Sequence, residues 1–221
     1  MNGIEALKHY PDPSPAKDRL LLAMLPGMGI KIEDFATQGL VKLAHAARQA
    51  VDVITVKPDQ TLYLDGGVAQ VLEQTILTPA REAGYRRVWL LGISLGGMGA
   101  LSCAAKYGDN IEGLILLAPF FGTQGTVAEL REAGGFAAWR PEASAATPPE
   151  REIISWLQTR LAGAPGPGLW LGHATRDRFA TGHRLLAETL PPSKTVEVDG
   201  GHDWAAWRMA FQALMARAPF G

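Results

Sequence analysis

The stretch Val88-Trp-Leu-Leu-Gly-Ile-Ser94-Leu-Gly-Gly97 decides the fold that this sequence predicts. A short apolar run, typical of a buried parallel strand, leads directly into a G-x-S-x-G pattern, and a helix is expected to follow at once. In that context the pattern indicates a nucleophile elbow, a tight turn that exposes a serine hydroxyl. Gly92 and Gly96 are expected where side chains would collide across the turn, and Gly97 lets the helix approach further. An ordinary glycine-rich turn is the alternative, and it would leave Ser94 without a chemical role.

Apolar runs alternate with amphipathic segments along the rest of the chain, as expected when parallel strands are covered by crossover helices on both faces. We expect about six strands and no pair of strands before Leu20, and the sequence leaves open whether the N-terminal arm adds a strand. The expected strands lie near Leu20–Leu25, Val51–Lys57, Arg87–Ile93, Gly113–Leu117, Gly168–Gly172 and Thr195–Val198. Helices are expected near Asp34–Gln49, Val68–Ala83, Gly97–Tyr107, Val127–Ala133, Pro149–Leu161, Gly182–Leu190 and Asp203–Arg217.

Two later segments continue the chain order nucleophile, acid, histidine of the α/β-hydrolases. Asp177 follows one predicted strand, and His202 follows the last. The sequence therefore resembles the α/β-hydrolase superfamily from Leu20 to Arg217, and the run Gly-Gly-His-Asp-Trp that ends at Trp204 is similar to the histidine loop of esterase D-like carboxylesterases. The resemblance implies one α/β-hydrolase domain over residues 1–221, with a mostly parallel sheet of about six strands and helices on both faces. The family's first hairpin has no counterpart before Leu20.

The resemblance implies Ser94 as nucleophile, His202 as general base and Asp177 as the acid that orients the histidine. Asp199 and Asp203 remain alternatives for the acid, although they flank His202 on one loop and would be poorly placed to reach its Nδ1 atom from behind. Acyl transfer also needs fixed donors for the developing oxyanion. We expect the backbone N–H groups of Leu95 and of Met28, on the loop after the first predicted strand, to serve as these donors.

Between residues 120 and 166 the alternation stops, and a long segment rich in Gly and Pro reads as a lid-like insertion that overhangs the site. Phe120 and Phe121, directly after a strand, are expected to form an acyl-pocket wall. Trp156, on a predicted helix, is expected to anchor the insertion. His173, at a strand end, is a further candidate for contact with the substrate.

The charges nearly cancel, with 21 Lys and Arg against 22 Asp and Glu, so the composition favours a small, mainly uncharged substrate over nucleic acid or an anionic membrane. Cys103 is the single cysteine, expected in the core rather than as a second nucleophile, and it suits a reducing compartment. The first residues, up to Arg19, lack the apolar run of a signal peptide, which favours a cytoplasmic protein. No transmembrane segment is expected.

These observations predict a serine hydrolase that cleaves a small carboxylic ester or thioester through an acyl-enzyme, without metal or organic cofactor. An amidase, a C–C hydrolase or an acyltransferase would use the same three residues. A non-catalytic ligand-binding protein on this fold is a further alternative, although it would be expected to have lost one of the three. The sequence specifies neither the acyl and leaving groups nor the oligomeric state.

Overall fold

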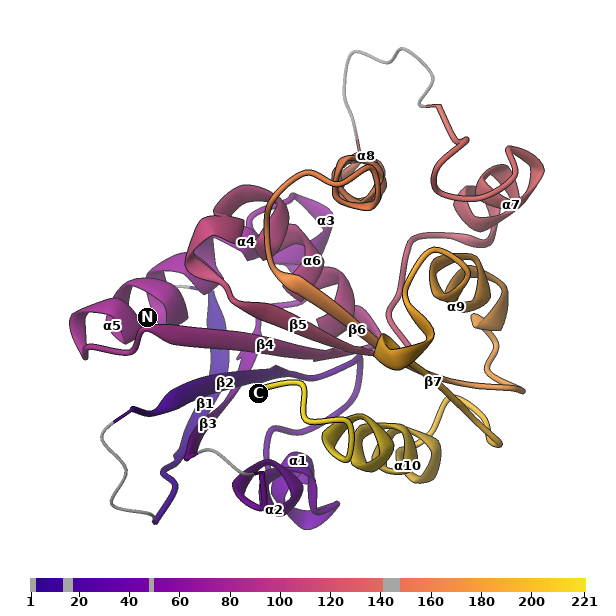
Figure 1. Ribbon diagram of the computed structural model, residues 1–221. Coiled ribbons are helices and arrows are strands. Elements are labelled where there is room, and N and C mark those ends of the chain that lie inside the picture. Colours follow the sequence, from indigo (N-terminus) through magenta and orange to yellow (C-terminus); the bar gives the residue numbers. More distant parts are fainter. Residues whose placement is uncertain (1–2, 14–17, 48–49, 141–147) are drawn as a thin grey trace.

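The computed structural model describes residues 3–13, 18–47, 50–140 and 148–221 of the chain. A seven-stranded sheet with the order β1-β3-β2-β4-β5-β6-β7 forms its centre (Figure 1). The strands are β1 (Ile4–Tyr10), β2 (Leu20–Leu25), β3 (Val51–Pro58), β4 (Arg87–Ile93), β5 (Gly113–Leu117), β6 (Gly168–Ala174) and β7 (Thr195–Val198). Every neighbouring pair is parallel except β1 and β3, which are antiparallel. The fold is therefore the α/β-hydrolase fold that the sequence predicted.

Strand β1 answers the question that the sequence left open, since the N-terminal arm adds one strand to the sheet. It pairs with β3 at the edge of the sheet, and residues such as Glu5, Lys8 and His9 are exposed. An edge strand buries little of either face, so its sequence carries no continuous apolar run by which it could be recognised.

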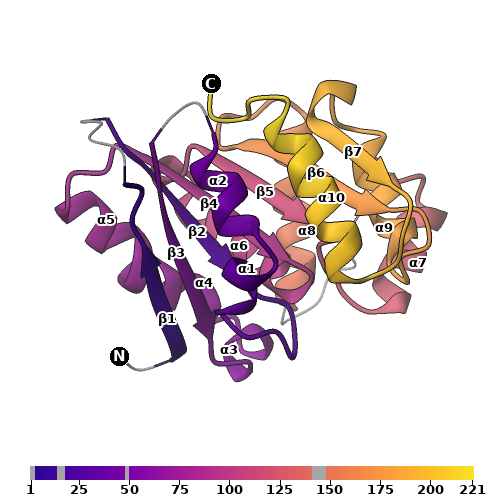
Figure 2. The same ribbon diagram turned by 90° about the horizontal axis from the view of Figure 1, so that it is seen from below.

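Helices cover both faces of the sheet. On one face lie α3 (Thr61–Leu64), α4 (Val68–Leu72), the π-helix η1 (Glu73–Leu77), α5 (Thr78–Glu82), α6 (Leu95–Tyr107) and α8 (Pro149–Leu161), and on the other lie α1 (Asp34–Thr37), α2 (Leu40–His45) and α10 (Trp204–Met215) (Figures 1 and 2). The remaining elements are α7 (Gln124–Glu132), α9 (Ala180–Ala187) and the 3₁₀ turns η2 (Gly108–Asn110) and η3 (Pro192–Lys194). None of the helices within the described ranges is long and apolar enough to cross a membrane.

The helix expected over Asp34–Gln49 is instead two short helices, and its last two residues lie outside the described part of the chain. Gly39 separates α1 from α2 with a φ of 85°, a left-handed conformation that ends a helical turn and that glycine adopts without strain. The predicted apolar periodicity continues across the break, because Leu40, Val41 and Ala44 are buried. The periodicity therefore identified the buried face but not the change of direction.

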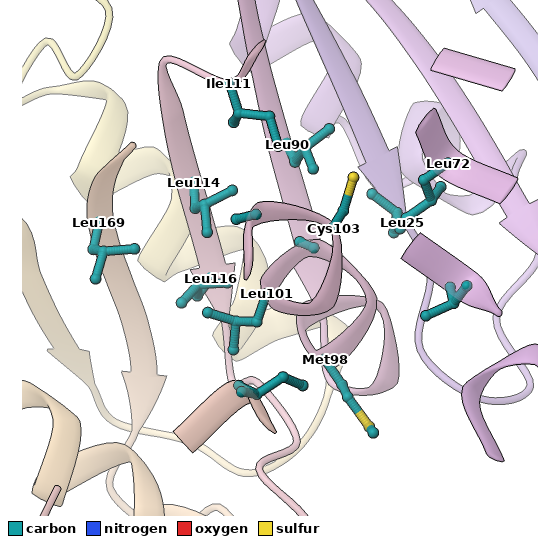
Figure 3. Packing of buried hydrophobic residues seen from close by; sticks show 14 of the residues in the cluster. Leu25, Leu72, Leu90, Met98, Leu101, Cys103, Ile111, Leu114, Leu116 and Leu169 are labelled. Carbon is teal, nitrogen blue, oxygen red and sulfur yellow. The ribbon is translucent and has the colours of Figure 1, made fainter. Parts of the chain in front are cut away.

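Two apolar clusters flank the sheet, one on each face. Figure 3 shows the cluster around α6, in which Leu101 points toward Leu116 and Cys103 toward Leu25 and Leu90. Cys103 is fully buried, and burial raises the pKa of its thiol to about 12. The expectation that Cys103 is a core residue is confirmed.

The insertion divides into two parts that contact different elements. Helix α8 contacts α6 and buries Ile153, Ile154 and Leu157 in the core, so it covers the sheet as an ordinary crossover helix. Helix α7 instead contacts α9 (Figure 1). Residues 141–147 of the predicted insertion lie outside the described ranges.

Candidate active site

Ser94 lies between β4 and α6 in a strained backbone conformation, with φ 51° and ψ −114°. Its N–H donates to the Leu117 carbonyl at 3.0 Å, and its own carbonyl accepts from the Phe120 N–H at 2.9 Å. Residues other than glycine rarely adopt a positive φ, and such strain persists only where the surrounding structure imposes it. The turn is therefore a nucleophile elbow in its geometry as well as in its sequence.

The glycines around Ser94 are required by close backbone contacts. A Cβ atom at Gly92 would lie 2.3 Å from the Gly96 carbonyl oxygen, and one at Gly96 would lie 2.2 Å from that of Leu25. A Cβ atom at Gly97 would lie 2.7 Å from the Pro119 side chain. Real Cβ atoms do not approach so closely, so the role predicted for these three glycines is confirmed.

Asp177 and His202 meet at the carboxyl edge of the sheet, where β4, β6 and β7 all end. The Nδ1 atom of His202 lies 2.7 Å from Oδ2 of Asp177. Two backbone hydrogen bonds join the loops that carry them, from Thr175 N–H to the Val198 carbonyl and from Arg176 N–H to that of Gly200, both at 2.9 Å. The sheet and these bonds together bring the acid and the histidine to hydrogen-bonding distance.

The Asp177 carboxylate is held in its ionised form. Burial raises the pKa of this group, but hydrogen bonds from the His202 ring and from the Phe179 N–H, the latter at 2.8 Å, outweigh burial and leave the pKa below its ordinary value. A buried anion against Nδ1 favours the tautomer with the proton on that nitrogen, which leaves Nε2 free to accept a proton.

The two alternative carboxylates have other partners. Asp199 is exposed and bonds the side chains of Arg176 and Thr175, and these hydrogen bonds lower its pKa. Asp203 caps helix α10 by accepting the Ala206 N–H at 3.0 Å. Of the three carboxylates, Asp177 is the one that bonds His202.

Aromatic rings hold the imidazole from two sides. The rings of Phe179 and Trp207 each lie 5.1 Å from that of His202, edge to face. Phe179 in turn contacts Phe120 at 5.5 Å, so Phe120, Phe179 and His202 form an aromatic row that leads from the elbow to the histidine. Sequence reasoning missed Phe179 and Trp207 as neighbours of the histidine. The position of Phe179 two residues after Asp177 was the available signal.

The loop that carries Met28 lies against the elbow. A Cβ atom at Gly27 would lie 3.1 Å from that of Ser94, and the Met28 side chain is 70% exposed. Within the described part of the chain, the N–H groups of Met28 and Leu95 donate no hydrogen bond. Both groups are thus available beside Ser94, where oxyanion donors were expected.

Phe120 and Phe121 occupy different environments. Phe120 is half-buried beside the elbow, whereas Phe121 is only 3% exposed and contacts Phe136 and His183 in the core. Phe121 therefore lies behind the surface on which the acyl-pocket wall was expected.

His173 is buried. Its ring lies 5.9 Å from that of the fully buried His183, and its Nδ1 atom lies 3.6 Å from a carboxylate oxygen of Glu197. Burial lowers the pKa of both histidines, that of His183 to about 4. Over the residues described, no group of three or more His, Cys, Asp or Glu side chains could hold a metal ion.

The fold and this edge of the sheet define an α/β-hydrolase of the serine hydrolase type. A serine on a strained strand-to-helix turn, followed along the chain by an acid and a histidine that meet at the same strand ends, is the arrangement of that class.

Comparisons with known proteins agree with this class. A family model described as "Serine aminopeptidase, S33" (Hydrolase_4) matches residues 68–162, a stretch that contains Ser94 but neither Asp177 nor His202. A search of curated protein sequences finds no significant match.

Solved structures resemble this chain over nearly its whole length. S-formylglutathione hydrolase of Staphylococcus aureus is 18% identical, with a TM-score of 0.64 over 92% of this chain and 82% of that one. The fluorophosphonate-binding serine hydrolase F of the same organism is 15% identical, with a TM-score of 0.66 over 94% and 86%. A monoacylglycerol lipase of Paleococcus ferrophilus is 15% identical, with a TM-score of 0.59 over 96% and 98%. At these identities the likeness concerns the fold.

Proposed function

We propose that the protein hydrolyses a small carboxylic ester through an acyl-enzyme formed on Ser94. The observation that carries the proposal is the hydrogen bond between the buried Asp177 carboxylate and the His202 ring, at the same strand ends as the strained Ser94 turn. These are the parts that acyl transfer by a serine requires.

In the proposed reaction, His202 Nε2 accepts the hydroxyl proton as the Ser94 oxygen attacks the ester carbonyl. The N–H groups of Leu95 and Met28 stabilise the negative oxygen of the tetrahedral intermediate. His202 then returns the proton to the leaving alcohol. In the second half of the reaction, His202 takes a proton from a water molecule that attacks the acyl-enzyme, and the acid is released from Ser94. No hydrogen bond joins the Ser94 and His202 side chains among the described residues, and such contacts often tighten only when substrate is bound.

The insertion between β5 and β6 is short, and its helix α8 packs against α6. The rest of the insertion can enclose only a small volume over the site, so we propose a short or medium acyl chain rather than a long one. Some of the solved structures with this fold are those of esterases, such as a ferulic acid esterase and an enterochelin esterase, which agrees with an ester substrate.

A fluorophosphonate probe and a nitrophenyl acetate assay test the proposal. The wild-type protein should be labelled at Ser94 and should release nitrophenol in a burst equal to one acyl group per active site. Ser94→Ala should abolish both, while Ser102→Ala, a matched change on the same helix, should leave both unchanged. Labelling without turnover of any ester, thioester or amide would instead favour a non-catalytic protein.

The single cysteine, which is buried and free, suits a protein that functions in a reducing compartment. On that basis we propose a cytoplasmic location. Fractionation of the cells that produce the protein checks this.

A further inference from the structure

A hollow adjoins the aromatic row at Phe179. It has a volume of about 240 Å³ and lies between α7 and the start of α9. Its lining includes Gln124, Val127, Arg131, Arg178, Phe179 and Thr181. Phe179 belongs both to this lining and to the aromatic row, so the hollow and His202 share one aromatic side chain.

Two guanidinium groups line this hollow without a carboxylate partner among the described residues. Arg178 lies over the Phe179 ring at 4.8 Å, and Arg131 projects from α7. Other arginines nearby are paired, since Arg176 bonds Asp199 and Arg184 bonds Glu197. Arginine is the side chain best suited to bind a carboxylate with two parallel hydrogen bonds. The lining therefore concentrates positive charge in a chain whose overall charge is near zero.

The position of the hollow relates it to the leaving group. In serine hydrolysis the imidazole returns its proton to the leaving oxygen, so the leaving group must lie beside the histidine. Phe179 contacts the His202 ring and also lines the hollow, so a leaving group that extends from His202 across Phe179 would enter the hollow lined by Arg131 and Arg178.

We propose that Arg131 and Arg178 form a subsite for a carboxylate carried by the alcohol or thiol leaving group of the substrate. This inference rests on the proposed function, which requires the leaving group to lie beside His202. It refines the expectation of a mainly uncharged substrate, because one anionic group at a fixed position suits two neighbouring arginines.

The test compares the acetate esters of 4-hydroxybenzoate and of methyl 4-hydroxybenzoate, which differ in one negative charge. The quantity measured is the ratio of kcat/KM for the anionic ester to that for the neutral ester, in wild type and variants. Arg131→Gln and Arg178→Gln should each lower this ratio by about fivefold, and the double variant by about tenfold or more. Added salt should lower the wild-type ratio, because it screens the ion pair.

Arg176→Gln is the matched control, since it removes the same charge from the loop before Phe179 at a residue that does not line the hollow. It should leave the ratio unchanged. Equal ratios in wild type and the double variant, or an equal loss in Arg176→Gln, would overturn the proposed subsite while leaving ester hydrolysis intact.

Calorimetric titration with 4-hydroxybenzoate provides a readout that does not depend on catalysis. The affinity of the wild type for this product should be about tenfold higher than that of the double variant. The two proteins should bind the neutral methyl 4-hydroxybenzoate with equal affinity. If neither ester is cleaved but this difference is present, the proposed function fails and the anion site stands. If the difference is absent, the anion site fails.

Discussion

The Nδ1 atom of His202 lies 2.7 Å from Oδ2 of Asp177, whose side chain is fully shielded from solvent while that of His202 is 12% exposed. A buried carboxylate bound to a partly open imidazole gives each group a different task, since the first can orient and the second can exchange protons with a substrate.

Asp177→Asn should fold normally and lower kcat by about three to four orders of magnitude, because an amide neither enforces the productive tautomer nor stabilises the imidazolium. Steady-state kinetics with nitrophenyl acetate measures this. Asp199→Asn and Asp203→Asn are the controls and should each change kcat by less than about tenfold, since their carboxylates bond Arg176 and the start of α10. A larger loss in either control would show that the acid is misassigned.

Ser94→Gly should be more stable than Ser94→Ala by about 1 kcal/mol, because glycine adopts a φ of 51° and ψ of −114° with less strain. Urea unfolding of the two variants measures the difference. The same pair at Ser102, within helix α6, should show the opposite order by about 1 kcal/mol, since glycine weakens a helix relative to alanine. Equal stabilities at position 94 would contradict a strained elbow.

Gly96→Ala should destabilise the protein by more than about 3 kcal/mol or prevent folding, because the new Cβ atom would lie 2.2 Å from the Leu25 carbonyl oxygen. Gly29→Ala is the control. It has a positive φ of 76° but no atom within 4 Å of the added Cβ, so it should cost only about 1 to 2 kcal/mol. Soluble yield and urea unfolding check both values, and similar costs at the two positions would contradict the backbone contact.

The stability of the protein should fall between pH 6.5 and pH 4 because His183 is buried. Burial lowers the pKa of His183 from 6.5 to about 4, against the raising effects of Asp177 and of the Pro119 carbonyl. In this range the unfolded chain binds a proton that the folded chain excludes, so acidification favours unfolding, by roughly 3 kcal/mol at pH 4 relative to pH 7. His173, whose pKa burial also lowers, adds to the same trend.

Urea unfolding at several pH values measures this dependence. His183→Gln keeps a donor for the Pro119 carbonyl, which the His183 ring contacts at 3.0 Å, but cannot titrate, so its stability should fall less on acidification. The exposed His9→Gln should keep the wild-type slope. An unchanged slope in His183→Gln would assign the pH dependence to other groups.

Activity against nitrophenyl esters should be highest for short acyl chains and should decline over a series from about two to about sixteen carbons, because the insertion over the proposed site is short and its helix α8 packs against α6. Phe120→Ala should shift the optimum to longer chains, since Phe120 is half-buried next to Ser94. Phe121→Ala, a change in the core, should reduce stability more than it changes the chain-length profile. An optimum at the longest chains would contradict the small acyl site.

Much of the fold could be predicted because its central strands are buried on both faces. Strands β2, β4 and β5 have the bounds that their apolar runs predicted, since an uninterrupted run is what a doubly covered strand requires. The start of α6 could be predicted from Gly92, Gly96 and Gly97, because only glycine permits the backbone contacts of the elbow. The edge strand β1 and the break at Gly39 left weaker patterns in the sequence, because neither depends on a continuous apolar face.

The sequence by itself determined which residue types were available at each strand end, and with them the candidates for nucleophile, acid and histidine. Tertiary structure alone decided how they are used. It selected Asp177 over Asp199 and Asp203 through hydrogen bonds between two loops, placed Phe121 behind Phe120, and brought Arg131 and Arg178 to one hollow from separate elements. The physical reason is that periodicity and local motifs record interactions between near neighbours in the chain, whereas the partner of a buried charge or ring is set by packing between distant segments.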